Sequence, residues 1–309
     1  MNNKFRHLIE IKELYEKGEN IIKYLRGLEL SDQNSFEDIL ISYDLQSGTY
    51  VDSYFKNKDF KDNYASAIAS VINNLAGSDK FKTILEIGVG EATTLAPLIK
   101  NLDLDVDMAY GLDISLSRLL FGNAFAKFMG IEKIQLFTAN LFKIPLPDNS
   151  IDIVYTSHSI EPNGGREKEA LKELYRIAGR YVVLLEPSYD MADDKGKIRM
   201  KKNGYITNLP LHASELGYSI IERRPFDHII NPLNPTELLI IEKHNVKKND
   251  AVFVCPWTGK KLDLINKNQL YSKESGYIYP VINDIPCLCP ENAIQTFDSQ
   301  EVENIFSKN

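Results

Sequence analysis

The sequence has few cysteines, a single tryptophan and no long apolar segment. Its 3 cysteines all lie in the last fifth of the 309 residues, which is not the spacing of a disulfide framework. No apolar run approaches the roughly 20 residues that cross a bilayer. The N-terminus also lacks the apolar stretch of a secretion signal. We therefore expect a cytoplasmic protein with reduced thiols and no membrane partner.

Positive charge is also scarce. The chain has 36 Lys and Arg against 43 Asp and Glu, so the formal net charge is -7 at pH 7. Proteins that bind nucleic acids or anionic membranes generally depend on a surplus of cations. The composition therefore argues against a nucleic-acid partner and favours a small-molecule ligand. It does not indicate an oligomeric state.

The length, with 43% hydrophobic and 26% charged residues, is sufficient for one full domain and a smaller unit. The patterns along the chain divide it into four parts. These are a helical N-terminal cap with a lid loop over residues 1–62, an α/β domain over 63–244, a small β-rich domain over 251–294 and a tail over 295–309.

The end of the cap, residues 43–57, breaks the helical spacing and contains Gly48 and three tyrosines, one of them Tyr50. We interpret it as an ordered loop. In one interpretation the loop closes over a ligand, with Tyr50 in contact with a cofactor. In the other, the tyrosines pack the cap onto the main domain.

Strands and helices alternate between residues 63 and 244. This alternation predicts an α/β fold, namely a Rossmann-like, doubly wound and mostly parallel seven-stranded sheet with helices on both faces. The last two strands are joined without a helix and predict an antiparallel edge. The expected strands are 83–87, 108–112, 134–138, 151–157, 181–186, 218–223 and 237–242.

The stretch KTILEIGVGEATTLAPL, residues 82–98, indicates a buried strand, a tight turn and a helix that opens at Glu91. Gly88 and Gly90 allow the backbone to turn sharply and a ligand to approach. The start of the helix offers free N–H groups. The turn is therefore a candidate site for a small polar cofactor.

Ligands of such sheets bind outside the carboxyl ends of the strands, so the residues that follow each strand are candidates. Asp113 follows the second strand, 23 residues after Gly90, where a carboxylate can accept hydrogen bonds from both ribose hydroxyls. The later strands are followed by Asn140, Leu141, Ser157 and His158.

Two kinds of cofactor fit a glycine turn followed by an acidic residue. The dinucleotide fingerprint G-x-G-x-x-G fails at its third glycine, because Thr93 stands there, and Glu86 would place a negative charge near a pyrophosphate. The same carboxylate is favourable beside an ammonium and a sulfonium group.

Taken together, these motifs resemble those of class I S-adenosylmethionine-dependent methyltransferases over residues 65–244. The first motif of that family is matched by Glu86-x-Gly88-x-Gly90, with Ala92 at the usual third glycine. The stretch 144–154 resembles the family's entry to the fourth strand, and Asn140 replaces a common acidic residue. The resemblance implies S-adenosyl-L-methionine as cofactor, held by Glu86, Gly88, Gly90, Asp113, Asn140, Leu141 and Ser157.

Methyl transfer can be catalysed largely by positioning, and a hydroxyl acceptor also benefits from a base. His158 is the candidate base, because it follows the fourth strand where acceptor and cofactor should meet. The alternative is that its ring only bonds neighbouring backbone. Glu161 either orients this imidazole or an amine substrate, or provides local electrostatics at a helix start.

The candidates for substrate binding are Arg166, Lys197 and Arg199. Arg166 follows a glycine pair before a helix, and the other two belong to a basic stretch in the insertion 186–205. These cations suit a phosphate or carboxylate on the acceptor. The alternative for the basic stretch is a solvated loop.

The C-terminal segment resembles the small activator subunits that partner certain tRNA and release-factor methyltransferases. The matching sequences are CP at 255–256, GYIYP at 276–280 and IP at 285–286. Some members of that family bind zinc through a C-x-x-C knuckle, but Thr258 occupies its second position here. A structural zinc site needs four Cys or His ligands, so we expect no metal.

The sequence therefore predicts a methyltransferase that transfers a methyl group to an oxygen or nitrogen atom of a small molecule or sugar. The C-terminal resemblance suggests a tRNA or protein acceptor as the alternative. The remaining hypothesis is a different kind of function, namely a non-catalytic module that still binds the cofactor.

Overall fold

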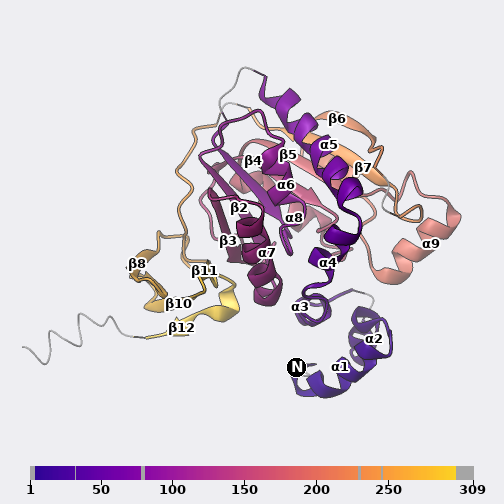
Figure 1. Ribbon diagram of the computed structural model, residues 1–309, viewed down its shortest axis with the longest axis horizontal. Coiled ribbons are helices and arrows are strands. Elements are labelled where there is room, and N and C mark those ends of the chain that lie inside the picture. The colour runs from indigo at the N-terminus through magenta and orange to yellow at the C-terminus, as the bar shows by residue number, and fades with distance from the viewer. Residues whose placement is uncertain (1–3, 32, 78–80, 229–230, 245, 297–309) are drawn as a thin grey trace, which may run out of the picture.

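The computed structural model describes residues 4–31, 33–77, 81–228, 231–244 and 246–296. Most of the expected tail, residues 297–309, lies outside the described residues. The chain forms a helical N-terminal region, a central sheet covered by helices, and a small β-rich unit at its C-terminal end (Figure 1). None of the described helices is both long and apolar enough to cross a membrane.

The central sheet has seven strands in the order β3-β2-β1-β4-β5-β7-β6. Only β7 runs against its neighbours, since it pairs antiparallel with both β5 and β6. The expected mixed sheet is therefore confirmed, with the reversed strand one position inside the edge. The strands are β1 (Thr83–Ile87), β2 (Met108–Asp113), β3 (Ile134–Thr138), β4 (Ile151–Ser157), β5 (Ala178–Pro187), β6 (Ser219–Pro225) and β7 (Thr236–Glu242).

Strand β1 is the point at which the strand order reverses, because β2 and β4 flank it in parallel. The chain from β1 to β3 extends the sheet on one side of β1, and β4 and β5 extend it on the other, so a crevice opens at the carboxyl ends of these strands. This is the edge at which the glycine turn and Asp113 were expected.

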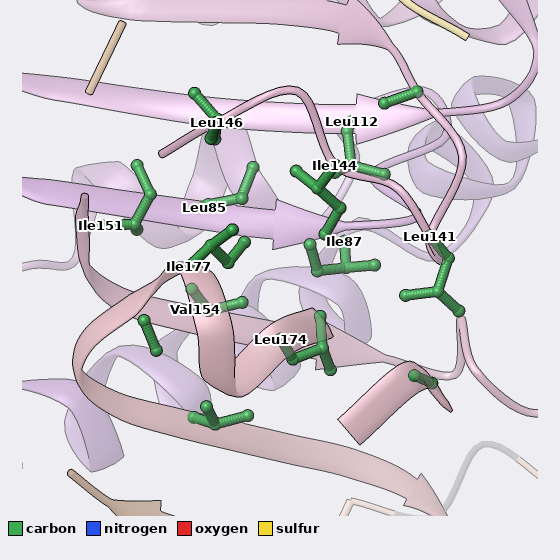
Figure 2. Packing of buried hydrophobic residues seen from close by; sticks show 14 of the residues in the cluster. Leu85, Ile87, Leu112, Leu141, Ile144, Leu146, Ile151, Val154, Leu174 and Ile177 are labelled. Carbon is green, nitrogen blue, oxygen red and sulfur yellow. The ribbon is translucent and has the colours of Figure 1, made fainter. Parts of the chain in front are cut away.

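The sheet separates two hydrophobic cores. On one face α5 (Lys58–Ala76), α6 (Leu95–Lys100) and α7 (Leu116–Phe128) cover strand residues such as Ile84. On the other face α8 (Glu167–Ile177) and α10 (Leu209–Glu215) cover residues such as Leu85. Successive strand residues thus face opposite cores, as the pleat requires. Figure 2 shows the second core, where Leu174 and Ile177 of α8 pack toward β1 and β4.

Helix α6 begins at Leu95, four residues after the expected start at Glu91. Ala92 occupies the left-handed region with φ of 55°, and a right-handed helix cannot continue through such a residue. A glycine is common at this position in the family that the motif resembles, and the positive φ explains why.

Two segments expected as loops contain helices. The tyrosine-rich segment 43–57 contains α4 (Thr49–Lys56), and the basic insertion contains α9 (Asp194–Asn203). The side chain of Asp193 caps α9 by accepting from Gly196 N at 2.7 Å, and the helix ends at Gly204 with φ of 66°. Helix α9 is short and polar, so its periodicity is weak in the sequence.

The N-terminal cap consists of a 3₁₀ turn (Lys4–His7) and helices α1 (Leu8–Glu16), α2 (Ile21–Leu28) and α3 (Phe36–Asp44), followed by α4. Its first three α-helices share a small core of their own that includes Ile11, Leu25 and Ile41. A buried ion pair joins Lys4 Nζ to Asp38 Oδ1 at 2.6 Å. The cap helices α1 to α3 therefore form a unit that lies beside the sheet domain (Figure 1).

The C-terminal unit contains β8 (Asp263–Asn266), β9 (Gln269–Ser272), β10 (Tyr277–Ile282), β11 (Ile285–Pro286), a 3₁₀ turn (Pro290–Asn292) and β12 (Ile294–Gln295). It packs against edge strand β3, where Leu288 N donates to Thr138 O at 2.9 Å. Covering an edge strand in this way prevents its pairing with another chain.

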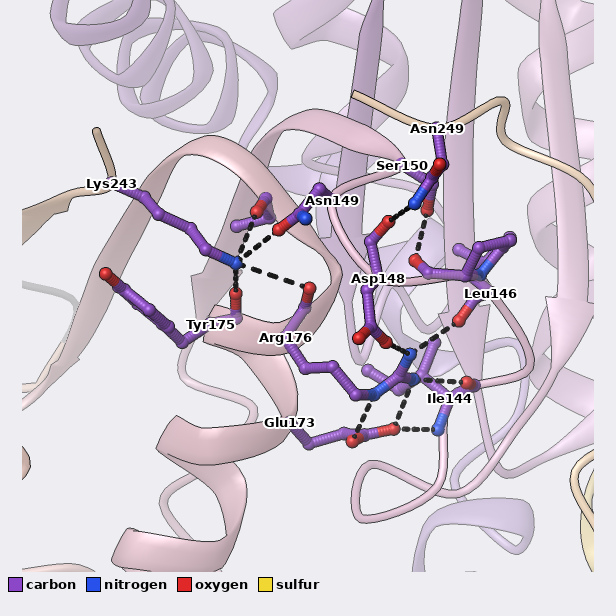
Figure 3. Close-up of polar contacts among 12 residues, drawn as sticks. Ile144, Leu146, Asp148, Asn149, Ser150, Glu173, Tyr175, Arg176, Lys243 and Asn249 are labelled. Atoms are coloured by element: carbon purple, nitrogen blue, oxygen red, sulfur yellow. Dashed lines mark hydrogen bonds and ion pairs between the residues drawn. The ribbon is translucent and has the colours of Figure 1, made fainter. Parts of the chain in front are cut away.

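The linker before the C-terminal unit is held at the opposite end of the sheet. Figure 3 shows Lys243 Nζ among carbonyl oxygens at the end of α8, and Asn249 Nδ2 donating to Asp148 O at 2.8 Å. Lys248 Nζ lies 2.6 Å from Asp152 Oδ2. The C-terminal unit is thus joined to the sheet domain at both ends of the strands.

Candidate functional site

A cavity of ≈ 230 Å³ lies at the carboxyl ends of the central strands, between the sheet and the cap. Eight of the candidate residues line it, and they come from turns, strand ends and the cap. They are Tyr50, Gly88, Asp113, Asn140, Leu141, Ser157, His158 and Arg166. Glu86, Gly90, Lys197 and Arg199 are not part of its wall.

The glycine turn has the close contacts that the sequence suggested. Gly88 has φ of 67°, and a Cβ there would lie 2.3 Å from Ser159 Cβ. A Cβ on Gly90 would lie 2.4 Å from Arg118 Nη2. Val89 N donates to Leu112 O at 2.9 Å, which fixes the turn to β2. The turn is therefore rigid and has no room for side chains at its two glycines.

Asp113 joins the turns after β1 and β2. Its Oδ2 accepts from Gly90 N and its Oδ1 from Ser115 N, each at 2.9 Å. The side chain is buried but lines the cavity. Each oxygen has a second lone pair, so the carboxylate can still accept hydrogen bonds from a diol in the cavity.

Arg118 is a wall residue that the sequence analysis missed. Ser115 caps α7 and places Arg118 in its first turn, where Nη1 lies 3.8 Å from Asp113 Oδ2. The guanidinium also lies over the rings of Tyr50 and Tyr43, at 4.4 and 5.3 Å from their centroids. Tyr50 therefore packs the cap against Arg118 and also lines the cavity. That it contacts a cofactor stays a prediction.

Glu86 lies behind the glycine turn. Its Oε2 accepts from Tyr155 OH at 2.7 Å, and the side chain is buried. Burial raises the pKa of Glu86 to about 8, despite the hydrogen bond from Tyr155. The carboxyl group therefore supports the turn from below, and it does not touch the cavity in this arrangement.

The imidazole of His158 is hydrogen-bonded through both ring nitrogens. Nε2 lies 2.8 Å from Thr236 Oγ1, and Nδ1 lies 3.2 Å from Glu161 Oε2. Burial opposes the charged ring, but the hydrogen bond and charge of Glu161 outweigh it and raise the pKa of His158. The backbone is also unusual, with φ of 54°. No ring nitrogen is left free for a substrate proton.

Glu186, a second missed residue, fixes the backbone that follows His158. Its Oε1 accepts from Ser159 N at 3.0 Å and from Ile160 N at 3.1 Å. Its Oε2 is buried without a partner among the described residues. Burial raises the pKa of Glu186 to about 7. The signal in the sequence was an acidic residue near the end of an otherwise apolar strand.

Helix α5 contributes two residues to the wall that the sequence did not single out. Tyr64 OH lies 2.8 Å from Ser157 Oγ at the end of β4. Lys61, one turn earlier, is half-buried, and burial lowers the pKa of its ammonium group. The signal for Lys61 was weak, because a polar residue near the start of a helix is common.

The three cations predicted to bind substrate lie in different surroundings. Arg166 lines the cavity, stacks over Phe142 at 3.5 Å and pairs with Glu169 at 2.6 Å. Arg199 Nη1 donates to Asn234 Oδ1 at 2.9 Å, outside the wall. Lys197 lies 5.7 Å from the ring of Tyr189. Arg166 alone of the three is thus placed to touch a ligand in the described cavity.

Carboxylates fasten the cap to the turns that follow β1 and β2. Glu91 accepts from Gly48 N at 2.8 Å and from Val51 N at 2.7 Å, which caps the start of α4. Asp44, at the end of α3, accepts from Ser115 Oγ at 2.7 Å. The cap, which covers the cavity, is therefore held by the same turns that form the cavity wall on the side of the sheet.

The cysteines of the C-terminal unit have separate surroundings. Cys255 Sγ lies 3.5 Å from Tyr279 OH, whereas the sulfur of Cys287 lies 3.7 Å from Ile285 O. Over the part of the chain that the structure describes, no three His, Cys, Asp or Glu side chains are grouped as metal ligands. That the protein binds no zinc stays a prediction.

Residues 84–180 match the family model described as a methyltransferase domain. Over these residues the chain is similar to a methyltransferase domain. The matched residues run from β1 to the start of β5 and include the glycine turn, Asp113 and His158. The match does not reach the C-terminal unit, whose resemblance to activator subunits is not confirmed.

A curated protein that is similar to part of this chain is the demethylmenaquinone methyltransferase of Anoxybacillus flavithermus. It is 37% identical over 81 residues, which are 26% of this chain and 34% of the relative. The chain therefore matches about a third of that relative's length.

Among solved structures, the magnesium protoporphyrin IX methyltransferase of Synechocystis PCC 6803 with bound SAH has a TM-score of 0.50 at 14% identity. The alignment covers 66% of this chain and 98% of that one. A SAM-dependent methyltransferase from Aquifex aeolicus has a TM-score of 0.43 at 15% identity, over 57% of this chain and 97% of that one. The first likeness supports the shared fold.

Proposed function

We propose that the protein is an S-adenosyl-L-methionine-dependent methyltransferase that transfers a methyl group to an oxygen or nitrogen atom of a small-molecule acceptor. The observation that carries the proposal is Asp113, whose carboxylate lines the cavity and is aligned by backbone N–H groups of the two turns after β1 and β2. The methyltransferase domain match over residues 84–180 supports the reaction class.

The donor set of the cavity fits this cofactor. Asp113 supplies acceptors for a ribose diol, and Ile114 and Leu141 supply apolar contacts for an adenine beside it. Gly88 leaves the turn free of a side chain where the amino-acid part of the cofactor would pass. The bound cofactor would supply a methyl group on a positively charged sulfur.

In this proposal the protein contributes mainly positioning. Asp113 and the glycine turn orient the cofactor, while Ser157 and Tyr64 define the end of β4 where the acceptor approaches. His158 shapes that end through its bonds to Glu161 and Thr236. Because the transfer relieves positive charge, alignment of acceptor and sulfonium accounts for much of the acceleration.

The proposal is tested by isothermal titration with S-adenosylmethionine and S-adenosylhomocysteine. We expect binding by the wild type and a loss of about 2 to 3 kcal/mol in Asp113→Ala, because two charged hydrogen bonds to the ribose disappear. Asp105→Ala, a carboxylate at an exposed position, is the matched control and should bind like the wild type. Absence of binding by a folded wild type at millimolar ligand would refute the proposal.

The acceptor class is tested separately with transfer RNA. A small-molecule enzyme should show no salt-dependent binding to it, consistent with the net charge of -7. Tight, salt-dependent binding would instead favour the nucleic-acid alternative. Cofactor binding without methyl transfer to any acceptor tested would favour a non-catalytic module.

A further inference from the structure

Lys61 has an unusual position for a lysine. It lies in the first turn of α5 and lines the cavity beside Tyr64, close enough to His158 that its charge lowers the pKa of that ring. The side chain is half-buried, and no carboxylate pairs with it among the residues that the structure describes. An ammonium group in such a place loses solvation without gaining a counterion.

The other charged side chains of the wall have partners. Asp113 lies beside Arg118, with 3.8 Å between Oδ2 and Nη1, and Arg166 pairs with Glu169 outside the cavity. Glu161 Oε2 lies 3.2 Å from His158 Nδ1 and 3.2 Å from Asn234 Nδ2. Among the described wall residues, Lys61 is thus the charged side chain without a partner, and an anionic ligand would neutralise it.

The hydrogen bonds of His158 also favour an anionic ligand. Both ring nitrogens are engaged by Thr236 and Glu161, so the imidazole offers no free position for removing a proton from a neutral hydroxyl. An acceptor that enters the cavity already ionised needs no such base. A cation beside its ionised oxygen would also favour that form.

We propose that the methyl acceptor is a small ring-bearing acid, and that Lys61 binds its ionised oxygen. The rings of Tyr43, Tyr64 and Phe142 on the wall suit an apolar body of this kind. This inference rests on the proposed function and specifies its substrate class.

The transfer balances without a proton acceptor. A lone pair of the ionised oxygen forms the new O–CH₃ bond as the S–CH₃ bond breaks, and the bonding pair stays on sulfur. The acceptor loses its negative charge and the sulfonium its positive charge. Lys61 releases the product, because a neutral ester or ether no longer attracts its ammonium group.

The test compares acids with their amides in protein saturated with S-adenosylhomocysteine. The probes are benzoate, salicylate, 4-hydroxybenzoate and cyclohexanecarboxylate, each beside its primary amide, measured by isothermal titration. We expect at least one acid to bind about tenfold more tightly than its amide, as for a charged hydrogen bond in a partly dry site.

The same pairs are then measured in Lys61→Met, Lys61→Arg and the control Lys56→Met. Lys56 lies on the exposed surface of α4 and outside the cavity wall. We expect the acid preference to vanish in Lys61→Met, to persist in part in Lys61→Arg and to be unchanged in Lys56→Met. Removing an unpaired half-buried charge should not unfold the protein.

The outcomes separate this inference from the proposed function. If S-adenosylhomocysteine binds but no acid is preferred over its amide, or if the preference survives in Lys61→Met, the role of Lys61 is refuted and the methyltransferase proposal stands. If folded wild type does not bind S-adenosylhomocysteine, both fail.

Discussion

The two ends of the cavity differ in how they are built. The cofactor end consists of two neighbouring turns after β1 and β2, joined by Asp113, and its charges are satisfied by backbone N–H groups and Arg118. The proposed acceptor end is assembled from α5, the β4–α8 connection and the start of β7. It contains the ammonium group of Lys61, which has no carboxylate partner among the described residues. One end is complete before any ligand binds, whereas the other leaves a charge for the ligand to balance.

The largest effect should come from breaking the cofactor end at Gly88. Gly88→Ala places a Cβ 2.3 Å from Ser159 Cβ at φ of 67°, so the turn must move. We expect a loss of about 3 kcal/mol or more in the free energy of unfolding, and no cofactor binding. Chemical denaturation and titration with S-adenosylhomocysteine measure both.

Gly130→Ala is the control for backbone strain alone. Gly130 also has a positive φ, of 72°, but a Cβ there meets nothing within 4 Å. We expect a loss of about 1 kcal/mol and unchanged cofactor binding. Equal losses in the two variants would show that the close approach at Gly88 is not what shapes the turn.

A buried carboxyl group supports each end, and both should make stability depend on pH. Burial raises the pKa of Glu86 to about 8 and that of Glu186 to about 7. In the unfolded chain both groups ionise near pH 4.5. Between these values the folded state holds the extra protons, so stability should fall as the pH rises.

Unfolding at pH 5 to 8 measures this dependence. One such group contributes at most about 1.4 kcal/mol per pH unit. Glu86→Gln should flatten the curve up to about pH 8 and Glu186→Gln up to about pH 7, because the amide does not titrate. Parallel curves for wild type and both variants would mean that these carboxyl groups are already ionised.

Attachment of the cap to the cofactor end is tested at Glu91. Glu91→Gln weakens the hydrogen bonds from Gly48 N and Val51 N, and we expect a loss of about 1 to 2 kcal/mol with faster hydrogen exchange of these two amides. Glu132→Gln, on the exposed surface, should change neither measurement. Unchanged exchange in Glu91→Gln would show that the cap is held by other contacts.

The sequence predicted that Gly88 and Asp113 would lie at the same edge of the sheet, because the signals that place them are close together in the chain. A short buried strand, a glycine turn and an acidic residue after the next strand are local signals, and the structure brings Gly88 and Asp113 to one wall. It missed Glu91 as an anchor of the cap, because its partners at Gly48 and Val51 are about 40 residues away.

The sequence predicted few of the residues at the proposed acceptor end. Lys61 and Tyr64 belong to a helix whose facing direction depends on tertiary packing, and Thr236 reaches His158 from a strand 78 residues later. One interpretation placed the basic insertion at the acceptor and the other in solvent; in the structure its Arg199 and Lys197 lie beside Asn234 and Tyr189. The position of a charged residue in a sequence does not show which other residues will contact its side chain in the fold.

The smallest predicted change concerns His158, the residue at which the two ends meet. His158→Asn keeps a side chain that tolerates the positive φ of 54° but loses the paired bonds to Glu161 and Thr236. We expect turnover to fall about tenfold, with cofactor affinity nearly unchanged, because the acceptor end loses its shape while the turns remain intact.

The pH profile distinguishes positioning from base catalysis at this residue. If His158 only positions the acceptor, the pH dependence of kcat/KM should keep its shape in His158→Asn, with only the amplitude reduced. Loss of an ionisation from the profile would instead identify the imidazole as the base and restore the interpretation that its place after β4 first suggested. An acceptor that is already ionised at Lys61 requires the first result, so this measurement also bears on the difference between the two ends.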